Sequence, residues 1–272
     1  MSQRMRLDGR TALVTGSTRG VGAAIARALA EAGAKVIVHG LRDDEQATEI
    51  CRWLESRDAL AGFLTGDLSG PMPESVDRLA QAALELADGL DLFVSNAGTY
   101  IDRPFLEMDF DTFDRTMKLN VYAGFLLTQR LARQWVEKET DARVLFIGSI
   151  NGRLAEPDHA AYDTSKGAVE MMVRTLCVSL ARHGIRVNGL APGLFETPLT
   201  APALADPRLR RWMEWHTPNG RIPGPEVCGE AAVFLLSDAA EHIHGHMLMV
   251  DGGMSAWQQP DPPPDDAWPP KE

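Results

Sequence analysis

The chain has 272 residues, 44% of them hydrophobic, so it is long enough to bury a substantial core and has the composition of a globular protein. Its formal net charge of −11 at pH 7 argues against nucleic acid or an anionic membrane as the main partner, since both bind concentrated Lys and Arg. The three cysteines have no metal-ligand spacing, no signal-like segment is evident, and no apolar stretch approaches the ~18 residues of a membrane-spanning helix. We therefore expect a cytoplasmic protein that does not cross a membrane.

Short β-rich runs alternate with helical patterns along the chain. The predicted strands are, in chain order, 11–15, 35–39, 60–64, 92–95, 143–147, 185–191 and 247–250. Such alternation is typical of a parallel sheet covered on both faces, and a ligand is then expected at the carboxyl ends of the strands. We predict one domain over residues 1–257, with a doubly wound α/β fold. The proline-rich, acidic segment 258–272 is predicted to be a disordered tail.

The first predicted strand runs into a glycine-rich turn. Its sequence is Thr15-Gly16-Ser17-Thr18-Arg19-Gly20-Val21-Gly22, and an alanine-rich helical stretch follows. In this arrangement backbone N–H groups and a helix N-terminus receive a pyrophosphate. Glycine is needed where the chain turns tightly and where the backbone must approach the phosphate closely. The turn alone also fits an ordinary strand-to-helix connection, so it requires a second signal.

The second signal is the set Ser149, Tyr162 and Lys166. A tyrosine and a lysine at i and i+4 share one face of a helix, so the ammonium group can favour the ionised phenol. A free phenol titrates near pH ~10, too high for efficient proton transfer at neutral pH, and a neighbouring positive charge makes it usable as an acid or base. Ser149 is placed to hold the oxygen that gains or loses the proton.

These motifs resemble those of the short-chain dehydrogenase/reductase superfamily, over about residues 7–253. Further motifs appear in the family's order and spacing: Asn96-Ala97-Gly98, Asn120, Arg186-Val187-Asn188, Pro192-Gly193 and Asp251-Gly252-Gly253. The resemblance implies a Rossmann-like sheet of seven strands in the order 3-2-1-4-5-6-7. It also implies a homodimer or homotetramer built through the helices that follow the fourth and fifth strands.

The resemblance assigns catalytic roles to four residues. Tyr162 would be the general acid in carbonyl reduction or the base in alcohol oxidation, and Ser149 would bind the substrate oxygen. Lys166 would lower the pKa of the tyrosine and bind the nicotinamide ribose, and Asn120 would hold a water in the proton relay. From the residues alone, Asn120 fits equally well a helical position that bonds nearby backbone.

The resemblance also implies a nicotinamide dinucleotide as cofactor. The residues implied to contact it are Gly16, Ser17, Thr18, Arg19, Gly20, Val21, Gly22, Leu41, Arg42, Asp67, Leu68, Asn96, Ala97, Gly98, Tyr162, Lys166, Pro192, Gly193 and Thr197. Asp67 is similar to the family residue that contacts adenine, although an Asp before Leu-Ser is also a common turn former.

Cofactor choice depends on the end of the second strand, where NAD-preferring relatives commonly carry an Asp that bonds the ribose. Here the sequence has no acid before Asp43. Arg19 and Arg42 are suited to bind a 2′-phosphate, because guanidinium groups recognise phosphate well. We predict NADP, with NAD possible because Asp43 and Asp44 are close and Arg42 also fits an ordinary surface position.

The substrate is predicted to be a small polar molecule. The stretch 171–200 and residues 216–226 resemble the gluconate 5-dehydrogenase branch, which implies a gluconate-like sugar acid. Arg153 is a candidate ligand for its carboxylate, although this loop also fits a position facing water. Residues 197–219 would form a lid over the substrate.

Other assignments compete with this one. A 3-oxoacyl-[acyl-carrier-protein] reductase is the alternative within enzymes, and a non-catalytic dinucleotide-binding sensor or scaffold is the alternative of another class. His242, His244 and His246 alternate, but Gly245 interrupts them and no further ligand completes a metal set, so no metal is predicted. Cys228 is predicted to be a structural thiol, since no activating base is evident nearby.

Overall fold

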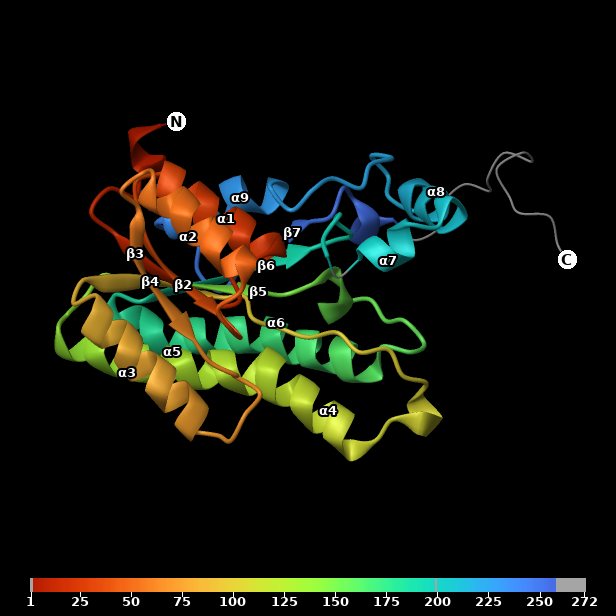
Figure 1. Cartoon of the computed structure of the whole chain (residues 1–272), viewed down its shortest axis with the longest axis horizontal. Helices are drawn as coiled ribbons and strands as arrows, with labels where there is room; N and C mark the ends of the chain where they lie inside the picture. The colour runs from red at the N-terminus through yellow and green to blue at the C-terminus, as the bar shows by residue number, and fades with distance from the viewer. Residues whose placement is uncertain (1, 199, 258–272) are drawn as a thin grey trace, which may run out of the picture.

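The fold is seen in a computed structural model, which describes residues 2–198 and 200–257. Its seven strands are β1 (Thr11–Val14), β2 (Lys35–Gly40), β3 (Leu60–Thr65), β4 (Leu90–Ser95), β5 (Arg143–Ile147), β6 (Arg186–Pro192) and β7 (Met247–Val250). They form one parallel sheet in the order β3-β2-β1-β4-β5-β6-β7 (Figure 1). The predicted fold class and strand order are confirmed. The predicted tail, 258–272, lies outside the described residues.

Helices lie on both faces of the sheet. They are α1 (Gly20–Glu31), α2 (Glu45–Glu55), α3 (Glu74–Leu86), α4 (Phe110–Met117), α5 (Ala123–Glu137), α6 (Ala160–Leu180), α7 (Ala201–Leu204), α8 (Pro207–Trp215) and α9 (Val227–Leu236). Short 3₁₀ segments span Gln3–Met5, Phe105–Glu107, Ile150–Gly152, Ala181–His183, Asp238–Ala240 and Met254–Ala256, and a π-helical turn spans Lys118–Tyr122. Figure 1 shows α1, α2 and α9 over one face and α3, α5 and α6 over the other. No described helix is long and apolar enough to cross a membrane.

Two hydrophobic cores lie on opposite sides of the sheet. Side chains alternate along a strand, so Ala12 and Val14 of β1 join the core under α1 and α9. Leu13, between them, joins the core under α3 and α5, where Trp135 is almost fully buried. Because both faces are covered, the central strands read as continuous apolar runs rather than alternating ones.

The amino-terminal end of the sheet holds two buried arginines. Arg143 of β5 and Arg186 of β6 are paired in register and are 3% and 6% exposed. Arg143 Nη1 donates to the Leu236 carbonyl at 2.6 Å, and Arg186 Nη2 donates to the Ser237 carbonyl at 2.7 Å. These carbonyls end α9, where helical partners run out. Burial lowers the pKa of Arg186 to about 10, and the charge of Arg143 adds to that shift.

We expect Arg143→Met to lower the free energy of unfolding by about 2–4 kcal/mol, because it leaves a buried carbonyl without its charged donor. Arg182→Met is the matched control: this side chain is exposed after α6, and its replacement should change stability by no more than about 0.5 kcal/mol. Urea unfolding monitored by circular dichroism measures both. Equal stability of the two variants would contradict the proposed capping of α9.

Candidate active site

A cleft of about 460 Å³ opens where the carboxyl ends of β1 to β6 meet. Its lining residues come from the loops after these strands, as expected for parallel strands that end at one edge. Every predicted cofactor contact except Ser17 lies in this lining. Segments from residue 16 to residue 200 are thus brought to one crevice, and their role in binding a dinucleotide remains a prediction.

The glycine turn after β1 is held by the loop after β4. Asn96 Nδ2 donates to the carbonyls of Thr15 and Gly16 at 2.9 and 3.0 Å. Gly22 packs so closely under the turn that an added Cβ would lie 2.3 Å from the Gly16 carbonyl oxygen. Gly20, at the start of α1, has φ +58°, and an added Cβ there would meet no described atom within 4 Å. The turn is therefore closely packed below and open above, which fits a bound pyrophosphate.

Ser17 is turned into the protein, in contrast to the prediction that it contacts the cofactor with the rest of the turn. Its hydroxyl donates to the Val14 carbonyl at 2.7 Å and accepts from the His39 N–H at 3.1 Å, which leaves it fully buried. His39 also lines the cleft, and its Nδ1 accepts the Gly16 N–H at 3.2 Å. Burial lowers the pKa of His39 to about 4, so the ring is neutral at pH 7. Sequence reasoning missed His39, although a polar residue within an otherwise apolar strand was a usable signal.

The end of the cleft beyond the glycine turn is formed by the loops after β2 and β3. Asp67 accepts from the Ser69 N–H at 2.8 Å and from the Ser69 hydroxyl at 2.6 Å, and the hydroxyl bond lowers the pKa of this carboxyl. The Asp67 side chain therefore forms the turn that the sequence left as its alternative role, while the residue also lines the cleft. Arg115 lines this end as well and was not predicted.

The region predicted to select NADP carries two exposed arginines. Arg19 and Arg42 both line the cleft, and neither forms an ion pair with another described residue. Asp44 caps α2 by accepting the Ala47 N–H at 3.0 Å, so this carboxylate is already engaged. A Cβ added at Gly40, the last residue of β2, would lie 2.6 Å from Thr18 Cγ2. An acidic side chain at Gly40 therefore does not fit beside the turn in its present position.

Ser149, Tyr162 and Lys166 line the other end of the cleft, as their spacing suggested. Ser149 follows β5, and its hydroxyl accepts the Asn151 N–H at 3.1 Å. Tyr162 and Lys166 lie one turn apart on α6, with Lys166 Nζ 5.5 Å from the centre of the Tyr162 ring. Lys166 Nζ donates to the Ile147 carbonyl at 3.0 Å, which holds the lysine against the end of β5.

The pKa of Tyr162 is raised in this arrangement, and the prediction that Lys166 lowers it stays a prediction. Burial raises the pKa of the phenol, a hydrogen bond with Ser149 opposes the rise, and the carboxylates of Asp163 and Glu156 add to it. Burial also lowers the pKa of Lys166 to about 8. The spacing i, i+4 gave the shared face correctly, but it carried no information on how deeply both groups are buried.

We expect the buried lysine to give a specific pH dependence of stability. Lys166 titrates at about 8 in the folded protein and near its ordinary value of 10.5 when unfolded. Between these values the unfolded state binds more protons, so the free energy of unfolding should rise with pH by up to about 3 kcal/mol relative to Lys166→Met. Below pH 8 both states hold the proton and the difference should be constant. Urea unfolding of both proteins from pH 7 to pH 10 checks this, and a flat difference would contradict it.

Asn120 lies in the π-helical turn between α4 and α5 and is 6% exposed. Its Oδ1 accepts the Thr99 N–H at 2.8 Å, and its Nδ2 donates to the Thr99 carbonyl and the Ser165 hydroxyl, each at 2.9 Å. Asn120 does not line the cleft and instead ties the loop after β4 to α6. Single π-turns often occur at functional sites. The predicted role in a proton relay stays a prediction.

The Arg153 side chain is already ion-paired within the protein, whereas the sequence suggested that it could bind a substrate carboxylate. Its Nε donates to both carboxylate oxygens of Glu170, at 2.9 and 3.0 Å, and Arg174 pairs with the same carboxylate. Arg153 also does not line the cleft. Because the guanidinium is already neutralised by a largely buried Glu170, the expectation that Arg153 binds a substrate carboxylate does not fit this structure.

A polar cluster that the sequence did not reveal adjoins Tyr162. The Tyr100 ring packs edge-on against the Tyr162 ring with centres 5.3 Å apart, and the Tyr100 hydroxyl lies 2.6 Å from His159 Nε2. His159 Nε2 is also 3.1 Å from the carboxylate of Asp102, and His159 Nδ1 is 3.3 Å from that of Glu156. The two tyrosines are far apart in sequence, so only the fold shows this contact.

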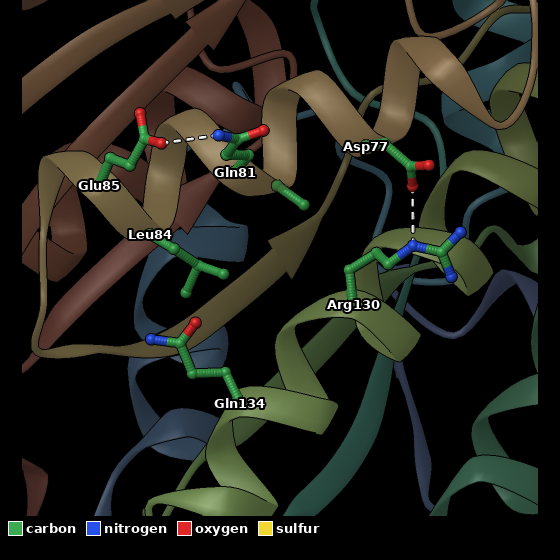
Figure 2. Close-up of a pocket in the computed structure, with 7 residues that line it drawn as sticks. Asp77, Gln81, Leu84, Glu85, Arg130 and Gln134 are labelled. Carbon is green, nitrogen blue, oxygen red and sulfur yellow. Dashed lines mark hydrogen bonds and ion pairs between the residues drawn. The ribbon is translucent and has the colours of Figure 1, made fainter.

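A second groove lies between α3 and α5, away from the loops that carry the motifs. Figure 2 shows its lining, in which Arg130 Nε donates to Asp77 at 2.7 Å and Gln81 donates to Glu85 at 2.8 Å. Its polar side chains largely satisfy one another, and none of them is a predicted site residue. We therefore place the active site in the cleft and not in this groove.

The remaining candidates are the alternating histidines, Cys228 and the predicted lid. Among residues 2–198 and 200–257, no three His, Cys, Asp or Glu side chains are grouped to hold a metal ion. The three alternating histidines precede β7, and Gly245, with φ +69°, breaks their alternation. Cys228 is fully buried, and burial raises the pKa of its thiol to about 12, which fits the predicted structural role. The predicted lid carries α7 and α8, and Thr197 lines the cleft.

Comparison with known proteins gives the family. A family model described as enoyl-(acyl carrier protein) reductase matches residues 16–255. The 3beta-hydroxysteroid dehydrogenase 1 of Eggerthella lenta is 34% identical over 251 residues, which cover 92% of this chain and 95% of that protein. The L-rhamnose-1-dehydrogenase of Scheffersomyces stipitis is 34% identical over 252 residues, covering 91% and 96%. A gluconate 5-dehydrogenase structure from Burkholderia cenocepacia, in complex with NADP and tartrate, is 35% identical, with a TM-score of 0.86 and coverage of 94% and 98%.

The chain belongs to the short-chain dehydrogenase/reductase superfamily, and its resemblance to the gluconate 5-dehydrogenase branch is confirmed. It is an NAD(P)-dependent oxidoreductase that acts on CH–OH groups of a small molecule. The alternative of a non-catalytic scaffold is therefore set aside.

Proposed function

We propose that this enzyme interconverts a hydroxyl and a carbonyl group on a small compound of the sugar and sugar acid class, with NADP(H) as cofactor. The observation that carries the proposal is that Ser149, Tyr162 and Lys166 line the same cleft as the glycine turn. The similar proteins include an L-rhamnose-1-dehydrogenase, which supports a neutral sugar as substrate, and a gluconate 5-dehydrogenase, which supports a sugar acid. A gluconate-like sugar acid is the candidate that the sequence favours.

The site residues supply positioning and proton transfer. Tyr162 donates a proton to the carbonyl oxygen during reduction and takes it back during oxidation, and the raised pKa of the phenol favours the donating form. The Ser149 hydroxyl, held by the turn after β5, bonds the same substrate oxygen. Lys166 holds positive charge next to the phenol while anchored to the Ile147 carbonyl. A nicotinamide dinucleotide held in this cleft would supply or receive the hydride.

The proposed reaction is tested by a substrate panel of aldoses, polyols, aldonates, simple ketones and acyl thioesters with both nicotinamides, followed by absorbance of the reduced cofactor. We expect turnover of a sugar or aldonate, and a loss of about 10²–10⁴-fold in kcat/KM for Tyr162→Phe, because the proton donor is gone. Tyr122→Phe is the control, since this half-exposed residue lies outside the cleft. Turnover of acyl thioesters alone would favour the acyl-carrier-protein reductase instead.

NADP is proposed as the preferred dinucleotide because exposed Arg19 of the glycine turn and exposed Arg42 after β2 line the same cleft, and the last residue of β2 is Gly40 rather than an acid. The structure of the Burkholderia cenocepacia relative in complex with NADP supports this choice.

We expect Arg42→Ala to weaken NADP⁺ binding about 10-fold while leaving NAD⁺ binding unchanged, because only NADP carries the 2′-phosphate. Arg52→Ala on α2, exposed and outside the cleft, serves as the control. Isothermal titration calorimetry measures both affinities. Equal losses for the two dinucleotides, or a tighter fit for NAD⁺ in the unchanged protein, would contradict the NADP assignment.

A homodimer or homotetramer is proposed from apolar side chains exposed on the helices after β4 and β5. Phe125 of α5 is 41% exposed, and Met171 and Val178 of α6 are 56% and 79% exposed. Large apolar side chains exposed on the surface of a helix are often covered by a partner chain. Light scattering should give a mass of two or four times 29.7 kDa, and a mass of one chain would contradict the proposal.

A further inference from the structure

The polar cluster next to Tyr162 is built from two loops that meet over the start of α6. Tyr100 and Asp102 follow the Asn96-Ala97-Gly98 motif, and the segment 151–159 follows Ser149. Asn151 connects the cluster to the catalytic serine, because its N–H donates to Ser149 Oγ at 3.1 Å. Tyr100 connects it to the catalytic tyrosine through the edge-on ring contact. A substrate bound at Ser149 and Tyr162 therefore lies close to this cluster.

His159 is the buried centre of the cluster. It is 8% exposed, and its Nδ1 has no hydrogen bond of good geometry to any described residue although Glu156 is 3.3 Å away. A buried polar atom left unpaired costs about 1–3 kcal/mol and calls for a partner. The carboxylate of Glu156 is 58% exposed, so it is open to a bound ligand as well as close to Nδ1.

Negative charge predominates on this side of Tyr162. Asp102 and Glu156 each keep more than half of the side chain exposed, while Asp163 is largely buried and accepts from Asn151 Nδ2 at 2.9 Å and from the Glu156 N–H at 2.9 Å. The influence of Glu156 and Asp163 reaches the catalytic phenol, since both contribute to its raised pKa.

The arginines nearest in sequence do not offset this charge. Arg103 is 3.6 Å from the carboxylate of Asp109, and Arg153 is bound to Glu170. Exposed carboxylates accept hydrogen bonds from hydroxyl groups, and bonds to charged acceptors are about twice as strong as those between neutral groups. A second carboxylate brought to the same place is repelled.

We propose that Asp102 and Glu156, held beside Tyr162 by Tyr100, Asn151 and His159, bind the hydroxyl groups of a neutral sugar or polyol and disfavour substrates that carry a carboxylate. This inference rests on the proposed function. Within its substrate class, it favours neutral sugars and polyols over a gluconate-like acid. It assigns the substrate to residues that adjoin the cleft at Tyr162 without lining it, and that the catalytic motifs do not include.

The test compares kcat/KM for aldoses with kcat/KM for the aldonates of the same carbon skeleton, in the unchanged enzyme and in Glu156→Gln. We expect the unchanged enzyme to prefer the aldoses. Glu156→Gln should lower kcat/KM for aldoses about 10-fold, because a neutral amide bonds hydroxyl groups less strongly than a carboxylate. It should also lower the ratio of kcat/KM for aldoses to kcat/KM for aldonates by about 10-fold or more, because the amide no longer repels an anion. Asp102→Asn, on the other loop, should shift the ratio in the same direction. Glu137→Gln, exposed at the end of α5 and not part of this cluster, should leave the aldose-to-aldonate ratio unchanged.

The outcomes separate this inference from the function on which it rests. A preference for aldonates in the unchanged enzyme, or a ratio that neither Glu156→Gln nor Asp102→Asn moves while both variants keep their melting temperature, overturns the inference and leaves the sugar-class oxidoreductase standing. No turnover of either aldoses or aldonates with either nicotinamide overturns the proposed function itself. A ratio shifted in one variant supports the inference even if the other variant fails to fold.

Discussion

The direction of the strands is the constraint on which the rest of this structure depends. All seven strands run parallel, so every loop that follows a strand emerges at the same end of the sheet. Helices cover both faces, and the two cores packed against the sheet are hydrophobic. The glycine turn, the loop of Asn96 and the loop of Ser149 therefore meet although 80 residues separate Asn96 from Gly16. Hydrogen bonds from Asn96 to the glycine turn then fix two of these loops to each other.

Much of the fold and of the cleft could be predicted from the sequence because the determining patterns are local. Each strand was placed within two residues of its observed ends, since apolar runs bounded by turn residues show where strands lie. Tyr162 and Lys166 were correctly assigned to one helical face, because that depends only on their spacing. The loop positions that line the cleft followed from the family motifs.

What could not be predicted depends on contacts between distant residues. Ser17 sits between Gly16 and Thr18, which both line the cleft, yet its hydroxyl points inward and accepts the backbone N–H of His39 on a different strand. The sequence suggested that Arg153 could bind a substrate carboxylate. Its ion-pair partner Glu170 lies about three turns into α6, too far along the chain for the sequence to reveal the contact. The pKa of Tyr162 depends on burial and on acidic side chains around it, which no spacing of motifs reveals. In each case the deciding contacts come from residues that only the tertiary fold brings together.

The paired arginines stabilise the amino-terminal end of the sheet, whereas the cleft lies at its carboxyl end. Arg143 and Arg186 tie the sheet to the end of α9 at the edge opposite the cleft. The loops that surround the cleft contribute little to that anchorage, so insertions and exchanges in them can accumulate over evolution without loosening the scaffold. A fold arranged in this way can acquire new chemistry through changes in the loops around the cleft, while the contacts at the opposite end of the sheet keep the chain folded.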